Sequence, residues 1–134
     1  MSDTIDVACL ILVSIQGRFL TTLRPPHKSL GSHWEFPGGK VENEEDPEHA
    51  LRRELREELH LEVDVLHPLP PTVHAYAFAT IRLIPYLAYC ENLPSIELTE
   101  HAESRWVTLN EARELEWAPA DLPILESLKG HLTH

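Results

Sequence analysis

The stretch that decides the fold is residues 38–61, which read GGKVENEEDPEHALRRELREELHL. Asp46 followed by Pro47 is typical of a helix start, because an aspartate side chain caps the first backbone N–H groups and proline suits the first helical position. Three leucines then recur at intervals of four residues: Leu51, Leu55 and Leu59. Residues at that interval form one apolar stripe on a helix. We therefore predict a helix from Pro47 to about Leu59 whose leucine stripe faces a core.

Three glutamates lie beside that stripe. On an ideal helix with about 100° per residue, Glu58 lies roughly 40° to one side of Glu54 and Glu57 roughly 60° to the other. Arg52 and Arg56 are expected on the far side, toward solvent. Carboxylates this close repel one another unless a cation is bound. Because hard oxygen ligands suit Mg²⁺ and Mn²⁺, the pattern favours a divalent-metal site over a merely solvated acidic face.

The overall charge limits which partners the chain can bind. Its 134 residues carry 11 Lys and Arg against 22 Asp and Glu, a formal net charge of −11. This balance argues against binding to polymeric nucleic acid or to an anionic membrane, both of which need a basic surface. Phosphate-bearing small molecules stay open, because a bound divalent cation can reverse the local sign of the charge.

Length and composition indicate one domain over residues 1–134, with 43% hydrophobic and 25% charged residues. Cys9 and Cys90 lie in separate apolar runs and are expected as unpaired strand residues. The run 7–15 has no basic segment before it and is too short to span a bilayer. We therefore expect a cytoplasmic protein, as a monomer or a homodimer.

Outside the quoted stretch, apolar runs alternate with turn residues. The expected strands are Val7–Ile15, Phe19–Leu23, Leu61–Leu66, Val73–Phe78, Ile81–Cys90 and Arg105–Leu109. Segment 24–37 contains proline and glycine and is expected to be a loop. Asn110 is expected to cap a short helix that runs through Leu115. The expected last helix begins at Asp121 and has apolar residues at helical spacing: Leu122, Leu125 and Leu128. Strands interleaved with helices predict a mixed-sheet α/β domain.

Residues 39–61 resemble the Nudix box of the Nudix hydrolase superfamily, G-x5-E-x7-R-E-U-x-E-E-x-G-U, where U is a bulky aliphatic residue. Eight of the nine defined positions match: Gly39, Glu45, Arg53, Glu54, Leu55, Glu57, Glu58 and Leu61. The departure is His60, where the family has a glycine that ends the helix in a left-handed conformation. Histidine tolerates that conformation better than most side chains.

The likeness extends to the MutT-type branch over about residues 5–130. It includes Arg24-Pro25, Lys28, Gly31 and the run 34–40 that leads into the box, WEFPGGK. The stretch 119–123, PADLP, resembles the part of that branch that contacts the base. The resemblance implies the Nudix fold, an α/β/α sandwich around a mixed β-sheet.

The resemblance also implies a metal-dependent catalytic centre. The implied metal ligands are Glu54, Glu57, Glu58, the Gly38 carbonyl and Glu100. Glu100 is preferred because it precedes Trp106 by six residues, although Glu97 and Glu103 lie close by. The implied cofactor is Mg²⁺, with Mn²⁺ as an alternative.

Further roles follow from the same resemblance. Glu54 would double as the general base, Arg53 would orient it, and Glu45 would pair with Arg53. The implied substrate contacts are Arg24, Phe36, Lys40 and Asp121, with Lys40 on phosphate and Asp121 on the base. Phe36 is equally compatible with an ordinary core position, and Asp121 with capping of the last helix.

The implied reaction converts a (deoxy)nucleoside triphosphate into the monophosphate and pyrophosphate. Oxidised 8-oxo-dGTP, removed to sanitise the nucleotide pool, is the leading candidate, followed by cytidine-type triphosphates and then by ADP-ribose or a dinucleotide polyphosphate. A nucleotide-binding module on the same fold, as in MutY-type DNA glycosylases, is the non-enzymatic alternative. Such a module lacks the catalytic carboxylates, so the presence of Glu54, Glu57 and Glu58 favours the enzyme.

Overall fold

Two eleven-residue strands, β1 (Thr4–Ser14) and β7 (Thr80–Cys90), run parallel along their whole length at the centre of the sheet. A computed structural model describes residues 4–28, 30–99 and 101–128. The other strands are β2 (Phe19–Leu23), β3 (Trp34–Glu35), β4 (Gly38–Lys40), β5 (His67–Pro68), β6 (Thr72–Ala75) and β8 (Glu103–Val107). The strand order in the sheet is β3-β2-β1-β7-β5, and in addition β4 pairs with β1, β6 with β7 and β8 with β2. Apart from the parallel pair of β1 and β7, all of these pairings are antiparallel. The expected mixed sheet is confirmed.

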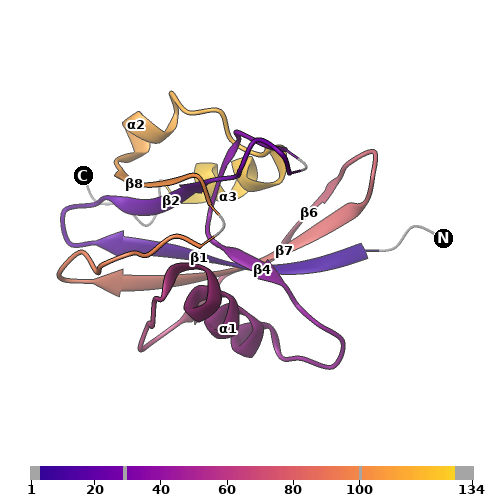
Figure 1. The fold of residues 1–134 in the computed structure, drawn as a ribbon, viewed down its shortest axis with the longest axis horizontal. Helices are drawn as coiled ribbons and strands as arrows, with labels where there is room; N and C mark the ends of the chain where they lie inside the picture. The colour runs from indigo at the N-terminus through magenta and orange to yellow at the C-terminus, as the bar shows by residue number, and fades with distance from the viewer. Residues whose placement is uncertain (1–3, 29, 100, 129–134) are drawn as a thin grey trace.

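Helices cover both faces of this sheet (Figure 1). Helix α1 (Pro47–Leu59) lies on one side, and α2 (Leu109–Ala112) and α3 (Leu122–Ser127) lie on the other. A short 3₁₀ helix, η1 (Pro119–Asp121), leads into α3. Alternate residues of β1 enter two different cores: Leu10 packs with the α1 leucines, and Ile11 packs with α3. A strand covered on both faces has to be apolar throughout, which explains the continuous run in its sequence.

Helix α1 has the bounds that its sequence predicts. The Asp46 side chain accepts hydrogen bonds from the backbone N–H groups of Glu48 and His49, at 3.1 and 3.3 Å. The helix ends at His60, whose φ of 54° is left-handed. The leucine stripe is buried as expected, with Leu51, Leu55 and Leu59 at most 1% exposed.

The prediction of a strand at Leu61–Leu66 is wrong. This segment is irregular, and the pairing with β7 begins only after it, at His67–Pro68. The reason lies in Arg52, which does not point to solvent as expected but donates to the carbonyls of Val63 and Asp64. A side chain thus satisfies backbone groups that a neighbouring strand would otherwise bind.

Several boundaries in the second half also differ from expectation. Strand β6 ends at Ala75 rather than Phe78, and the loop expected over 24–37 contains β3. The cap of α2 is Thr108 rather than Asn110, because Thr108 and Glu111 form a reciprocal capping box. The expected apolar face of the last helix holds for Leu125 and Leu128, whereas Leu122 is 44% exposed.

The two cysteines are free and lie on β1 and β7, as expected. No helix among the described residues combines the length and apolarity needed to cross a bilayer.

Candidate active site

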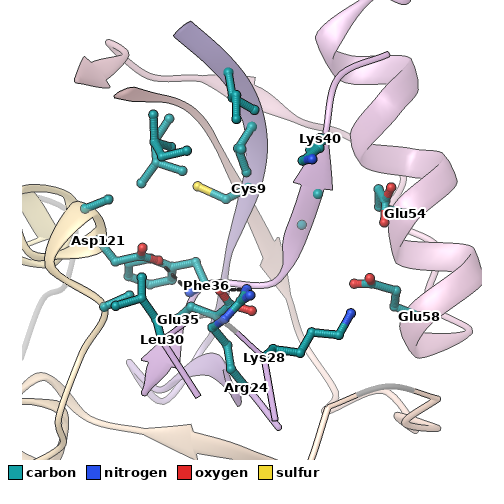
Figure 2. Close-up of a pocket in the computed structure, with 18 of the residues that line it drawn as sticks. Cys9, Arg24, Lys28, Leu30, Glu35, Phe36, Lys40, Glu54, Glu58 and Asp121 are labelled. Atoms are coloured by element: carbon teal, nitrogen blue, oxygen red, sulfur yellow. Dashed lines mark hydrogen bonds and ion pairs between the residues drawn. The ribbon is translucent and has the colours of Figure 1, made fainter. Parts of the chain in front are cut away.

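A cavity of about 570 Å³ opens between β4 and α1 on one side and η1 on the other (Figure 2). Glu54 and Glu58 reach it from α1, and Asp121 reaches it from the opposite wall. Between these ends lie the cationic side chains Arg24 and Lys28. The cavity therefore has a carboxylate end at α1, a middle part with basic groups, and the Asp121 carboxyl group at the opposite end.

The glycine pair allows α1 to approach the sheet closely at this cavity. Strand β4 pairs with β1, so that Gly38 is opposite Cys9 and Gly39 is opposite Ala8. A Cβ atom at Gly39 would lie 2.5 Å from Glu54 Oε2, and one at Gly38 would overlap the Ala8 carbonyl. A side chain at Gly38 would collide with the backbone of β1, and one at Gly39 would displace the Glu54 carboxylate. Glycine at position 39 lets the Glu54 carboxylate rest against the backbone of β4, and glycine at position 38 lets β4 pass close to β1.

Arg53 organises the carboxylates around it. Its Nε and Nη2 donate to the two oxygens of Glu45 at 2.9 and 3.0 Å, a bidentate pair. Its Nη1 donates to Glu54 Oε1 at 3.0 Å and to Glu57 Oε1 at 3.3 Å. The hydrogen bonds to Glu45, and then the one to Glu54, raise the pKa of Arg53 above its ordinary value. The hydrogen bonds from Arg53, followed by one from the Glu42 backbone, lower the pKa of Glu45 to about 2.

The sequence-predicted metal ligands are only partly brought together. Glu54, Glu58 and Gly38 all line the cavity, whereas the Glu57 side chain is 61% exposed and paired with Arg53. Glu100 lies outside the described residues. Within the described part of the chain, no three carboxylate, imidazole or thiol groups converge as a ready ligand set.

The donor chemistry nevertheless fits a hard divalent cation. Glu54 and Glu58 are four residues apart, so their carboxylates lie one turn apart on the same face of α1. Both point into the cavity (Figure 2). Carboxylate oxygens beside a backbone carbonyl are the ligands that Mg²⁺ and Mn²⁺ take.

The opposite end of the cavity is built on Asp121. Its Oδ2 accepts a hydrogen bond from the backbone N–H of Phe36 at 2.9 Å, and the residue is 5% exposed. Asp121 stands at the N-cap position of α3, but its side chain makes no capping hydrogen bond, which corrects the alternative role expected from the sequence. Burial, and then the charge of Glu35, raise the pKa of Asp121 well above its ordinary value. Ionising this buried carboxyl group is therefore unfavourable, and a ligand that donates N–H groups to it would stabilise the ionised form, as the Phe36 N–H does.

Phe36 serves this end mainly through its backbone. Its ring is 3% exposed and packs against Phe19 and Trp117, with ring centroids 5.8 and 5.0 Å away. Of the two positions expected for Phe36, the structure favours the core for the ring and the cavity wall for the N–H group. Lys40 and Arg24, the other expected substrate contacts, both line the cavity.

Sequence reasoning missed several residues of the cavity, among them Glu35, His101 and Tyr76. Glu35 binds Arg24 Nη1 at 3.2 Å and His101 Nε2 at 3.1 Å. The Tyr76 hydroxyl accepts a hydrogen bond from the Ala120 N–H at 2.8 Å, next to Asp121. A signal was available for Glu35, because a charged residue between Trp34 and Phe36 interrupts an aromatic run. None was available for His101, whose partner lies 66 positions away.

A family model described as a NUDIX domain matches residues 3–128. The chain belongs to the Nudix hydrolase family. The expected fold and family are thereby confirmed, and the box at residues 39–61 is the segment that forms β4 and α1 of this Nudix domain.

Relatives of this Nudix hydrolase carry names of nucleotide hydrolases. It is 32% identical over 120 residues to the CTP pyrophosphohydrolase of Escherichia coli K12, covering 87% of this chain and 85% of that protein. It is 34% identical over 83 residues to the 8-oxo-dGTP diphosphatase of Proteus vulgaris, covering 62% of this chain and 74% of that protein. The solved structure of the E. coli ORF135 protein matches with a TM-score of 0.80 and 32% identity, over 96% of this chain and 91% of that one.

Proposed function

We propose that this Nudix hydrolase cleaves a nucleoside triphosphate to the monophosphate and pyrophosphate with the help of a divalent metal ion. The observation that carries the proposal is the position of Glu54. Its carboxylate lines the cavity, rests against Gly39 and is held by Arg53 at 3.0 Å. A carboxylate fixed at the edge of a cavity can accept the proton of an attacking water. The names of the relatives, a CTP pyrophosphohydrolase and an 8-oxo-dGTP diphosphatase, support the substrate class.

The metal would be held by Glu54, Glu58 and the Gly38 carbonyl, with Glu57 and Glu100 as the further ligands. When bound, Mg²⁺ or Mn²⁺ would offset the triphosphate charge and lower the pKa of a bound water. Arg53 keeps Glu54 directed at the cavity, and Glu45 holds Arg53 with two bonds. The positive charge of the metal ion would let a chain of net charge −11 bind a polyanion.

The two ends of the cavity suggest how the nucleotide lies. The triphosphate belongs at the carboxylate end, within reach of Lys40, Lys28 and Arg24, and the base belongs at Asp121. A buried carboxyl is stabilised by N–H donors, as the Phe36 N–H already shows. Guanine offers N1–H and N2–H₂ and cytosine offers N4–H₂, whereas thymine and uracil would present an oxygen. Guanine-type triphosphates, 8-oxo-dGTP included, and cytosine-type triphosphates are therefore the proposed substrates.

The test is a panel of triphosphates assayed for pyrophosphate release: 8-oxo-dGTP, dGTP, CTP, dCTP, dTTP and dUTP. A mismatch at Asp121 costs about 1–3 kcal/mol, so dTTP and dUTP should have kcat/KM values roughly ten- to a hundredfold lower. Asp121→Ala should flatten this order more than it lowers the best rate. A dTTP rate among the best, or an order unchanged in Asp121→Ala, would contradict the assignment of Asp121. Turnover of ADP-ribose or a dinucleotide polyphosphate alone would replace the proposed substrate class.

A further inference from the structure

Three side chains from three different strand ends form a connected series along the wall of the cavity. His101 precedes β8, Glu35 lies in β3, and Arg24 follows β2. His101 Nε2 lies 3.1 Å from Glu35 Oε2, and Arg24 Nη1 lies 3.2 Å from Glu35 Oε1. Because each carboxylate oxygen has its own partner, Glu35 links the imidazole to the guanidinium.

The exposed fraction of the side chains increases along this series from His101 to Arg24. The side chain of His101 is 6% exposed, that of Glu35 is 18% exposed, and that of Arg24 is 28% exposed. The inner end is thus anchored in the protein, and the outer end is a cation that lines the cavity (Figure 2). A buried residue that is held in place can fix the orientation of a more exposed side chain that contacts a ligand.

The backbone around the series is held in place as well. The Arg24 N–H donates to the His33 carbonyl at 3.0 Å, and the Arg24 carbonyl accepts from the Ser32 N–H at 2.9 Å. The Ala102 N–H, next to His101, donates to the Leu23 carbonyl at 2.9 Å. The Glu35 carbonyl accepts from the Thr21 hydroxyl at 2.9 Å. The side chains therefore provide the remaining freedom, and the Glu35 carboxylate is one fixed partner that directs the guanidinium.

The histidine is an unusual choice for this anchor. Its Nδ1 is buried and has no hydrogen-bond partner among the described residues. A buried polar atom without a partner is destabilising, so this ring is not explained by stability alone. What the imidazole supplies is one N–H, at Nε2, directed at a carboxylate oxygen that can only accept.

We propose that His101 is a positioning residue, which divides the Glu35 carboxylate between two donors and so aims Arg24 at the nucleotide. Without His101, Glu35 Oε2 loses its partner inside the protein. The carboxylate then turns toward the nearest remaining donors, those of Arg24, because carboxylates and guanidinium groups favour a bidentate pair. Arg24 is drawn toward Glu35 and away from the substrate. The inference rests on the proposed function, because it takes Arg24 as a nucleotide contact.

The substitutions at His101 separate aiming from simple packing. Glutamine places an amide N–H near the position of Nε2, whereas asparagine is too short to reach Glu35. We expect His101→Asn to raise KM for CTP and dGTP about tenfold with little change in kcat, because a contact made equally in ground and transition states is lost. We expect His101→Gln to restore KM to within about twofold of the parent. The melting temperature of His101→Gln should stay close to that of the parent, since the amide is similar in size to the imidazole and keeps the bond to Glu35.

A double-mutant cycle with Arg24 tests the route of the effect. If His101 acts through Arg24, His101→Asn combined with Arg24→Ala should bind no more weakly than Arg24→Ala alone. Binding is measured by calorimetry with CMP and dGMP, so that the readout needs no turnover. His67→Gln, on exposed β5 and away from the cavity, is the matched control and should leave KM and binding unchanged.

The outcomes distinguish this inference from the proposed function. Failure of the parent protein to hydrolyse any triphosphate would overturn the proposed function, whatever the variants do. Normal turnover with no rescue by His101→Gln, or with additive effects of the His101 and Arg24 changes, would overturn the positioning role and leave the proposed function intact. Equal changes in kcat and KM together with a lower melting temperature in His101→Asn would also overturn it.

Discussion

At the scale of single residues, Glu54 and Glu45 show how one arginine gives two carboxylates different roles. Both bind Arg53, but Glu54 lines the cavity and Glu45 does not. We expect Glu54→Gln to lower kcat by at least about 10³, because one change removes a base and a metal ligand. Glu45→Gln should cost clearly less, since Glu45 acts only through Arg53. Steady-state kinetics with CTP and circular dichroism check both variants; equal, small losses would contradict these roles.

The same Glu45–Arg53 pair predicts an acid limit to stability. The pKa of Glu45 is about 2 in the folded protein against 4.5 for the free side chain, so the folded state favours the carboxylate. The contribution is therefore complete above about pH 4.5 and is lost as the pH falls toward 2. Glu45→Gln should make the melting temperature less dependent on pH between these values. An unchanged slope in this window would show that the pair does not couple to folding.

At the scale of an element, the end of α1 shows a local rule that the chain breaks without losing the helix. His60 adopts φ 54°, a conformation that glycine reaches without strain. Its ring lies 3.8 Å from Glu97, and both side chains are more than half exposed, so the pair adds little. We expect His60→Gly to be neutral or to stabilise by on the order of 1 kcal/mol, which corresponds to roughly 3 °C in melting temperature. His60→Ala keeps the strained backbone conformation and serves as the control. A clear drop in the melting temperature of His60→Gly would contradict the prediction and indicate a stabilising contact of the His60 side chain.

At the scale of the whole molecule, charge and metal should act together. A chain of net charge −11 that places Glu54 and Glu58 in one cavity is expected to need a cation to bind a triphosphate. We expect turnover to vanish in excess EDTA, to return with Mg²⁺ or Mn²⁺, and to be strongest at alkaline pH. Mg²⁺ at about a hundred times its Kd should also stabilise the fold by about 2.7 kcal/mol, and by less in Glu58→Gln. Turnover that persists in EDTA would refute the metal requirement.

Local signals in the sequence account for the parts of the site that come from one segment. The Asp46 cap, the leucine stripe, the glycine pair and the carboxylates of α1 all follow from spacings within residues 38–61. The family and the fold class follow from the same stretch. The strand expected at 61–66 failed because its carbonyls bind Arg52, and a propensity scale carries no information about such a partner.

The sequence by itself determined α1, its cap, its buried face and the carboxylates that α1 brings to one end of the cavity. Only the tertiary structure decided the other end. The bond between Phe36 and Asp121 joins residues 85 positions apart, and the bond between His101 and Glu35 joins residues 66 positions apart. Hydrophobic periodicity and helix capping involve residues within one or two helical turns of one another, whereas these two contacts depend on the order of strands in the sheet. Burial, which raises the pKa of Asp121, likewise arises only when distant segments close over it.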